Sequence, residues 1–340
     1  MSNTTVIGLD IGRSAVKVVA AHNGKFHRLI FPSIVSPAIQ IGIRDVAENA
    51  ALETVTIDGV DYFTGDTAKV QGRIGKSLGL SDDWTETTPY LALVASAMKR
   101  LAQQEVPGLD DPYLVIGTPS RLFRLHKDSL ARRTLQAVNA QTIRVLPQPM
   151  GVYSSFVTDA QGSPIKGRHR DANRAPLSWA VIEVGHFTTD FLLIRQGQYV
   201  ESASVSTDGL HFAIDAVVRR LSDRGLQVTH VEAEEILRTK VVKNFGEVID
   251  VSAEVDAAIG AIATTILTAA STLLSEEARR LDGVLVAGGG GVVVYESLKA
   301  KWRNTLLVEH ARMAVAEGYC RFGISAVAKR AMAEKHDAHV

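Results

Sequence analysis

One pattern in the sequence occurs twice, about half a chain apart, and it constrains the fold more than any other feature. Two short apolar runs, Val6–Asp10 and Ala15–Ala21, are joined by a turn of small and polar residues. Trp179–Val184 and Asp190–Arg195 repeat this arrangement. Short apolar runs bounded by turn residues predict β-strands. A strand, a tight turn and a second strand that recur at this distance predict two structurally related halves.

The remaining sequence predicts helices and further strands. Apolar residues at helical spacing predict helices at 89–104, 129–139, 210–224, 233–242, 254–274 and 311–333. Further strands are expected at 26–35, 55–63, 113–117, 143–146 and 283–287. Within 55–63, the Asp58-Gly59 pair predicts a hairpin turn. Strands that alternate with helices indicate an α/β protein.

Size and charge limit the classes of protein to consider. A chain of 340 residues exceeds what one hydrophobic core usually fills, so two lobes are expected. Lysine plus arginine equals aspartate plus glutamate, 37 each, which gives a formal net charge of zero. No basic surplus draws the chain onto bare DNA or an anionic membrane, so a role at DNA would need a partner. The same neutrality leaves little long-range repulsion against self-association.

Two features bear on location. Cys320 is the single cysteine, and residues 1–5 lack the basic and apolar regions of a signal peptide, so we expect a reducing cytoplasm. Ala257–Ser275 carries no charge and approaches membrane-spanning length. Its many alanines, threonines and serines favour a helix packed in a protein interior over a membrane span.

The first turn, residues 11–14, lies between the first two strands. Tight turns of this kind direct successive backbone N–H groups at one point and bind phosphate oxygens. Gly12 permits close approach of the backbone, Asp10 could hold water molecules around a magnesium ion, and Lys17 could neutralise phosphate charge. Taken alone, the segment is more simply interpreted as an ordinary hairpin.

The second half contains two further candidate ligand-binding segments: the second turn, residues 185–189, and a glycine cluster, Gly288–Gly291. Glu183, Gly185 and the paired Thr188 and Thr189 offer the same acid, backbone and hydroxyl groups. The glycine cluster follows an apolar strand and would let a flat ligand lie on bare backbone. No Gly-Lys-Ser/Thr follows it, which excludes a Walker loop.

Other conspicuous residues have plainer interpretations. The polar stretch 159–176, with four basic residues, is expected to be an exposed loop between lobes, either solvated or in contact with a partner or phosphate. The ten histidines show no metal-ligand spacing. His186 lies inside the second turn, where it is either solvated or in contact with phosphate. Cys320 is expected to pack in a helix rather than to react.

The order of these motifs resembles the actin-like ATPase superfamily, which includes actin, MreB, FtsA, DnaK-type chaperones and sugar kinases. The segments 10–17 and 183–190 are similar to its two phosphate loops, and 286–291 to its adenosine motif. The segments 146–153 and 311–322 are similar to its two connecting segments, so that the resemblance spans residues 6–322. Lys17, seven residues after Asp10, and the sequence Val-Gly-x-x-Thr-Thr-Asp at 184–190 are similar to the ParM/StbA plasmid-segregation branch.

The resemblance implies an actin-like (ribonuclease H-like) α/β fold of two duplicated lobes with a nucleotide cleft between them. Lobe I is expected at 1–155, with a small subdomain at about 31–83, and is completed by a C-terminal helix at 311–340. Lobe II is expected at 156–310.

The resemblance also implies a site for ATP or ADP with Mg²⁺. The implied catalytic residues are Gln148, which would orient the attacking water, and Asp10, Glu183 and Asp190, which would arrange the metal. Asp10 and Glu183 would hold Mg²⁺ through water. The implied nucleotide-binding residues are Gly12, Arg13, Ser14, Lys17, Gly185, His186, Thr188, Thr189, Gly209, Glu235, Lys240, Gly288, Gly289 and Gly290.

One residue departs from the family pattern. Glu183 stands where aspartate is usual, and its extra methylene moves the carboxylate by about one carbon–carbon bond. A displacement of that order costs catalysis heavily. We therefore expect ATP binding more readily than fast hydrolysis.

The implied function is a nucleotide-switched filament that segregates plasmids. Its partners would be further copies of the chain and a centromere-binding adaptor of the ParR type, with plasmid DNA reached only through the adaptor and no membrane involved. The alternatives on the same fold are a small-molecule kinase, a chaperone-like ATPase and a non-polymerising scaffold. No substrate-binding domain of a chaperone follows the nucleotide motifs, and no evident sugar-binding aspartate accompanies them. Fold by itself does not decide among these functions.

Overall fold

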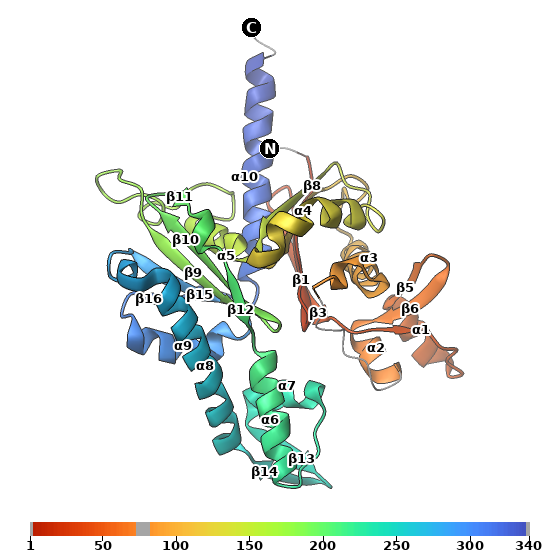
Figure 1. Ribbon diagram of the computed structural model, residues 1–340. Coiled ribbons are helices and arrows are strands. Elements are labelled where there is room, and N and C mark those ends of the chain that lie inside the picture. The colour runs from red at the N-terminus through yellow and green to blue at the C-terminus, as the bar shows by residue number, and fades with distance from the viewer. Residues whose placement is uncertain (1–2, 73–81, 338–340) are drawn as a thin grey trace. The chain divides into compact units, whose positions relative to one another are not determined.

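The computed structural model describes residues 3–72 and 82–337. The chain divides into two compact units (Figure 1). Unit 1 contains Met1–Ala175 and Met313–Val340, and unit 2 contains Pro176–Arg312. The C-terminal segment thus returns to the unit that begins the chain.

The main sheet of unit 1 has the strand order β3-β2-β1-β7-β8. β1 pairs antiparallel with β2 and parallel with β7. The tight turn between β1 and β2 explains the antiparallel pair, whereas the parallel pair requires a long crossover. The strands are β1 (Val6–Ile11), β2 (Ala15–His22), β3 (Lys25–Pro32), β7 (Tyr113–Thr118) and β8 (Thr142–Pro147).

Helices cover both faces of this sheet. Alternate residues of β1 point to opposite faces: Ile7 and Leu9 join the core that includes α3, whereas Gly8 lies against α10. α5 packs along α10 on the same side (Figure 1). The helices are α3 (Thr88–Gln103), α4 (Ser120–Thr134), α5 (Gln148–Val157) and α10 (Ala314–Asp337), and a 3-10 turn, η1 (Trp84–Glu86), precedes α3.

Glycines bring α10 unusually close to its neighbours. A Cβ on Gly8 would lie 2.1 Å from the Ala316 carbonyl oxygen. A Cβ on Gly318 would lie 1.6 Å from the Gly151 carbonyl oxygen. Any side chain at these positions would force the backbones of β1, α5 and α10 apart, so the sequence requires glycine there.

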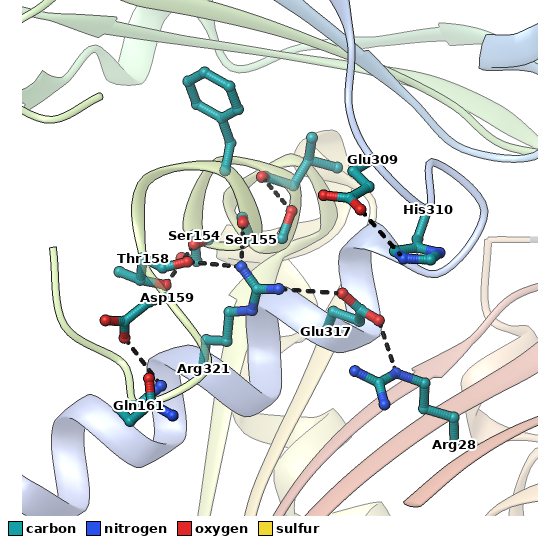
Figure 2. Close-up of polar contacts among 12 residues, drawn as sticks. Arg28, Ser154, Ser155, Thr158, Asp159, Gln161, Glu309, His310, Glu317 and Arg321 are labelled. Atoms are coloured by element: carbon teal, nitrogen blue, oxygen red, sulfur yellow. Dashed lines mark hydrogen bonds and ion pairs between the residues drawn. The ribbon is translucent and has the colours of Figure 1, made fainter. Parts of the chain in front are cut away.

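A buried glutamate links three elements of unit 1 (Figure 2). Glu317 of α10 accepts a hydrogen bond from Arg28 Nε of β3 at 2.9 Å and from Arg321 Nη2 at 3.4 Å. Arg321 Nη1 also donates to the carbonyl oxygens of Ser155 and Thr158, both at 2.6 Å. These carbonyls lie at the end of α5, where a helix has no internal donors for them. Arg321 therefore caps α5 and fixes its end to α10.

A small three-stranded sheet of unit 1 lies within the predicted subdomain range 31–83, of which residues 73–81 lie outside the described part of the chain. Its strand order is β4-β6-β5, and Asp58 and Gly59 have positive φ in the β5–β6 turn, as the predicted hairpin requires. Ala50, Phe63 and Ala68 form its buried cluster. The elements are β4 (Val35–Pro37), α1 (Arg44–Leu52), β5 (Thr54–Ile57), β6 (Val60–Thr64) and α2 (Gly65–Gln71).

The sheet of unit 2 repeats the order of unit 1. Its strands run β11-β10-β9-β15-β16, and β12 pairs with β10. β9 is antiparallel to β10 and parallel to β15, as β1 is to β2 and β7. The predicted relation between the two halves is therefore confirmed. The strands are β9 (Trp179–Val184), β10 (Thr188–Arg195), β11 (Gln198–Tyr199), β12 (Ser206–Asp208), β15 (Gly283–Ala287) and β16 (Thr305–Leu307).

Helices and one hairpin complete unit 2. β13 and β14 form a two-stranded sheet that follows α7 (Figure 1). The elements are α6 (His211–Asp223), α7 (His230–Thr239), β13 (Val241–Asn244), β14 (Glu247–Asp250), α8 (Ser252–Leu274) and α9 (Gly291–Lys301), with 3-10 turns η2 (Glu201–Ala203) and η3 (Ser275–Arg279).

The helix α8 is buried on one face rather than all round. By length and composition it could cross a membrane, but 33% of its apolar window is buried in the unit. Side chains such as Val255, Ile262 and Ile266 enter the core at helical spacing. On the exposed face, threonine hydroxyls donate to carbonyl oxygens one turn earlier, for example Thr264 to Gly260 at 2.9 Å. The prediction of a packed helix is confirmed for one face only, and the larger part of the apolar window is not buried.

Three sequence-based boundaries are wrong. The helix expected at 129–139 begins at Ser120 and ends at Thr134. The helix expected at 233–242 ends at Thr239, because Lys240 is left-handed with φ 56° and starts the hairpin. The loop 159–175 belongs to unit 1, not to the second lobe, because it packs on α10: a Cβ on Gly162 would lie 2.7 Å from the Ser325 amide nitrogen.

Candidate functional site

The first turn, between β1 and β2, is held by backbone bonds and by one serine. The Gly12 amide donates to the Ala15 carbonyl at 3.2 Å and closes the turn. Ser33 braces it from the end of β3, because its hydroxyl donates to the Gly12 carbonyl and its amide to the Ser14 carbonyl. Ser33 was not predicted, because no local sequence pattern indicates a contact that comes from another strand.

A carboxylate, an amine and an amide meet beside this turn. Lys17 Nζ donates to Asp10 Oδ2 at 2.9 Å, and Gln148 Nε2 donates to Asp10 Oδ1 at 3.0 Å. Asp10 and Lys17 are opposite each other in the β1–β2 register, and Gln148 is the first residue of α5. The Asp10 side chain is 4% exposed and that of Lys17 is 15% exposed. The structure thus brings three of the expected residues of unit 1 into one cluster.

The side chain of Arg13 points elsewhere in unit 1. Its guanidinium lies over the ring of Trp84, 4.6 Å from the centroid. Burial lowers the pKa of Arg13 to about 10, against the opposing effect of Asp82 and Asp83. A phosphate contact by Arg13 stays a prediction, and it would require the guanidinium to share or leave the Trp84 face.

The second turn, between β9 and β10, closes in the same way as the first. The Gly185 amide donates to the Thr188 carbonyl at 2.9 Å, which matches the bond from Gly12 to Ala15. Backbone amides from the start of α6 brace this turn: Gly209 donates to Phe187 at 3.0 Å and His211 donates to His186 at 2.8 Å. A Cβ on Gly209 would lie 2.7 Å from the His186 carbonyl oxygen, so glycine is required for this approach.

Asp190 orients hydroxyl groups behind the second turn. It has no exposed surface and accepts hydrogen bonds from Thr188 Oγ1 and Ser206 Oγ, both at 2.6 Å. Thr189 Oγ1 donates to the Asp208 carbonyl at 2.9 Å. Both Asp190 oxygens therefore serve protein hydroxyls in this structure, and a part for Asp190 in arranging magnesium stays a prediction. Ser206, which comes from β12, was not foreseen.

Glu183 lies between the second turn and the glycine cluster. Glu183 and Ala287 are paired at the carboxyl ends of the adjacent parallel strands β9 and β15. A Cβ on Gly288 would lie 2.6 Å from Glu183 Oε1 and 2.3 Å from the Val184 carbonyl oxygen, and Gly288 has φ +88°. The Gly290 amide donates to the Val184 carbonyl at 2.9 Å. Two of the predicted motifs of unit 2 therefore share one end of its sheet.

The glycine cluster offers bare backbone to a ligand. Gly289 is exposed, and a Cβ there would meet no atom within 4 Å. In an open α/β sheet, the carboxyl ends of the strands are where ligands bind. The open backbone of unit 2 suits a flat ligand. In unit 1, the Asp10 carboxylate offers the hard oxygen ligands that magnesium prefers. Among residues 3–72 and 82–337, no group of three or more His, Cys, Asp or Glu side chains could ligate a metal directly.

The helix α7 presents a different acid from the one expected. Glu234 Oε2 lies 3.7 Å from His186 Nδ1 of the second turn. Glu235 is exposed, and Lys240 Nζ donates to Asp256 at 2.7 Å. The structure thus brings Glu234 to the turn, whereas ligand contacts of Glu235 and Lys240 stay predictions. A helical wheel centred on the buried Ala233 and Leu237 would have indicated which acid lies nearer the core.

Family comparisons agree with the duplicated sheets. The family described as actin like proteins N terminal domain matches residues 8–151. The family described as archaeal actin homologue MreB-like, C-terminal, matches residues 181–300. No curated protein sequence gives a significant match.

Solved structures resemble the whole chain. A 15-stranded ParM filament from Clostridium botulinum aligns with a TM-score of 0.76 at 21% identity, over 95% of this chain and 99% of that one. The archaeal actin homolog Ta0583 aligns with a TM-score of 0.71 at 21% identity, over 96% of this chain and 100% of that one. Its complex with ADP aligns with a TM-score of 0.68 at 21% identity, over 96% and 99%. At 21% identity, the similarity to these structures establishes the fold of the chain and nothing more. Two matched domain families and two sheets of the same strand order show that the chain belongs to the actin-like protein superfamily.

Proposed function

We propose that this chain is an ATPase that binds ATP with Mg²⁺ and polymerises into dynamic filaments for plasmid segregation in the cytoplasm. The observation that carries the proposal is the duplicated turn, closed by Gly12 in unit 1 and by Gly185 in unit 2 with the same backbone bond. Each turn lies beside an acid that is more than nine-tenths buried, Asp10 or Glu183. Paired acid–glycine turns supply the backbone donors and carboxylates that a triphosphate and its metal need.

The residues of unit 1 have distinct tasks in this proposal. Lys17 and the amides of the first turn, with Ser14, hold phosphate oxygens. The amide nitrogen of Gln148 is fixed by Asp10, which leaves its oxygen to orient a water molecule. That water attacks the γ-phosphorus, the bond to the β-phosphate oxygen breaks, and ADP leaves with the bonding electron pair.

The residues of unit 2 serve mainly to hold the nucleotide. The amides of the second turn bind phosphate, and the glycine cluster receives the adenosine. The Thr188 hydroxyl, which donates to Asp190, would turn its hydrogen toward a phosphate oxygen when the nucleotide binds. Asp10 and Glu183 would hold Mg²⁺ through water, and the ion would neutralise phosphate charge.

Self-association is supported by the ParM filament of the same fold and by the formal net charge of zero. A switch between nucleotide states would bias the affinity between subunits, as for any two-state element biased by a ligand. An adaptor of the ParR type would couple the filament to plasmid DNA, and the chain itself would contact neither DNA nor membrane.

The test combines calorimetry with sedimentation and negative-stain microscopy. We expect saturable binding of ATP·Mg²⁺ and filaments above a critical concentration. Gln148→Ala should give longer-lived filaments, because it slows hydrolysis without removing the phosphate anchor at Lys17. Folded protein that binds no ATP would refute the proposal, and phosphorylation of a small metabolite without polymer would establish a kinase instead.

The departure at Glu183 has its own test. If the extra methylene misplaces the metal, Glu183→Asp should raise ATP turnover. Gly288 leaves room beside the carboxylate for either length of side chain, so the fold should tolerate the change. Equal or lower turnover would show that the site is built around glutamate.

A further inference from the structure

The β13–β14 hairpin ends in a fully exposed aromatic residue. Phe245 is 100% exposed, and Val248 of β14 is 69% exposed. Single exposed apolar residues are common on protein surfaces. Here, however, an aromatic ring and a valine share the tip of a small hairpin, which has little core of its own to stabilise it.

The backbone at this tip is also unfavourable for phenylalanine. Asn244 pairs with Glu247, so Phe245 and Gly246 form a two-residue loop, with φ of 46° and 91°. Positive φ at both positions is the pattern of a type I′ turn, which favours Asn, Asp or Gly at the first of them. A bulky residue with positive φ is an outlier. Phe245 is thus unfavourable twice, in its backbone conformation and in the exposure of its ring to water. Such a residue points to a contact with another molecule.

Unit 1 carries an open pocket in its small subdomain, lined by both apolar and polar side chains. The pocket has a volume of about 400 Å³ and lies between the β4–α1 segment and the β5–β6 strands. Ile39 at its edge is 50% exposed. Its apolar wall consists of Ala38, Ile39, Ile41, Ala47, Ala50 and Phe63.

The charges around the pocket and the hairpin are complementary. Asp61 and Lys99 line the pocket. Lys99 Nζ donates to the carbonyl oxygens of Ala51 and Thr54, both at 2.7 Å, so its ammonium group is fixed in place. The hairpin carries one base and one acid at equal distance from Phe245 along the chain, Lys243 and Glu247, both exposed.

We propose that Phe245 of one copy inserts into this pocket of a second copy, with Lys243 beside Asp61 and Glu247 beside Lys99. The two surfaces differ, so the contact is heterologous and can continue from copy to copy without closing. It deepens the proposed function, because it assigns one subunit contact of the proposed filament. A membrane is the less suitable occupant for the hairpin, since a tip with balanced charge gains nothing from anionic lipids.

The first test removes the ring without weakening the hairpin. Phe245→Asn supplies a residue that the turn favours, so the thermal midpoint of the monomer should stay the same or rise. Its critical concentration for polymer should rise at least tenfold, as for a buried aromatic anchor. Leu125→Ala, which removes a side chain that is 78% exposed on α4, is the control and should change neither quantity. Polymer formed by Phe245→Asn at the wild-type concentration would overturn the contact but not the filament.

The second test exchanges the charges. Lys243→Asp and Asp61→Lys should each raise the critical concentration, and the double variant should restore it, because the pair is then reversed. Additive losses in the double variant would contradict the pairing. All three variants should bind ATP as the wild type does, since neither residue belongs to the nucleotide site.

The third test does not depend on polymer. Phe245→Cys and Ile39→Cys are prepared as separate proteins and mixed under oxidising conditions. Cys320 is buried, so the introduced thiols are the reactive ones. We expect a disulfide-linked heterodimer well above the level given by Leu125→Cys mixed with Ile39→Cys. Equal yields would overturn the contact.

If the wild type forms no filaments and yet the heterodimer forms, the proposed function fails and the contact stands. A double variant that links only within one chain would place the hairpin in its own pocket and overturn the proposal.

Discussion

The two turns occupy the same place in two sheets of the same strand order, yet the protein holds them in different ways. In unit 1, side chains take a large part: the Ser33 hydroxyl and amide brace the carbonyls of the turn, and Lys17 and Gln148 fix Asp10 beside it. In unit 2, it is held mainly by backbone amides at the start of α6 and by the fully buried Asp190. The duplicated topology decides where a turn lies, whereas local side chains decide how firmly it is held and how it responds to charge.

The largest expected difference concerns the glycines. In Gly288→Ala, the new Cβ would lie 2.3 Å from the Val184 carbonyl oxygen at φ +88°, so both strain and a clash result. We expect a loss of about 3 kcal/mol in the free energy of unfolding of unit 2. In Gly12→Ala, the nearest backbone atom, the Ala15 carbonyl oxygen, is at 2.9 Å, and we expect a loss of about 1 kcal/mol. Urea denaturation measures both. Equal losses would show that the glycine cluster after β15 is no more tightly packed than the first turn.

The next largest difference concerns the hydrogen-bond acceptors behind the turns. Asp190→Ala removes the Asp190 acceptor from the buried Thr188 hydroxyl and from the partly buried Ser206 hydroxyl, and should cost about 2 kcal/mol of stability. Ser33→Ala removes one bond from the first turn and should cost about 1 kcal/mol. Asp190→Asn, which keeps one acceptor oxygen, is the control and should fall between them. A larger loss of stability in Ser33→Ala than in Asp190→Ala would contradict this comparison.

Charge should matter more in the first turn than in the second. Lys17→Met removes a cation next to the expected phosphates, and ATP affinity should fall at least tenfold, about 1.4 kcal/mol. The dependence of affinity on salt should weaken as well. His186→Gln in the second turn should change affinity by less than about threefold, because backbone amides carry that side of the site. Isothermal titration at two salt concentrations measures both affinities. A larger loss of ATP affinity in His186→Gln than in Lys17→Met would contradict the prediction.

The smallest effect uses Cys320 as a reporter of unit 1. Burial raises the pKa of its thiol to about 12, so the folded state holds almost no thiolate at pH 8. Labelling by a thiol reagent then requires α10 to separate from β1. Gly12→Ala should raise the labelling rate about fivefold, in proportion to the lost stability. Gly288→Ala should leave it close to wild type, and a large increase there would mean that the two units open together.

The sequence predicted both turns and the strands beside them, because apolar periodicity and glycine placement are local signals. It did not predict the short strands β12, β13, β14 and β16. It missed the start of α4, since Arg121–Lys127 is mostly polar and shows little of its buried face. It placed the end of α7 too late, because a left-handed lysine carries no mark in the sequence.

The details of the candidate site were harder to predict. Ser33, Ser206 and Trp84 reach the turns from distant elements, and only the folded sheet brings them there. Glu234 and Glu235 are adjacent on α7 and point in different directions, so a shift of one residue decides which of them lies near His186. Asp10 and Lys17 were identified from the residues of the first turn and Gln148 through family resemblance, and the structure then placed the three in contact.

The position of α10 in the chain also determines which unit can finish folding first during translation. The helix that covers one face of β1 and β7 is translated after all of unit 2, because it starts at Ala314. Unit 2 can fold on the ribosome as soon as it emerges, whereas unit 1 must wait with an apolar sheet face uncovered. The unit that emerges first is therefore the last to close. A nascent chain stalled before Ala314 would expose the Gly8 face of β1, which is a surface for chaperones to bind.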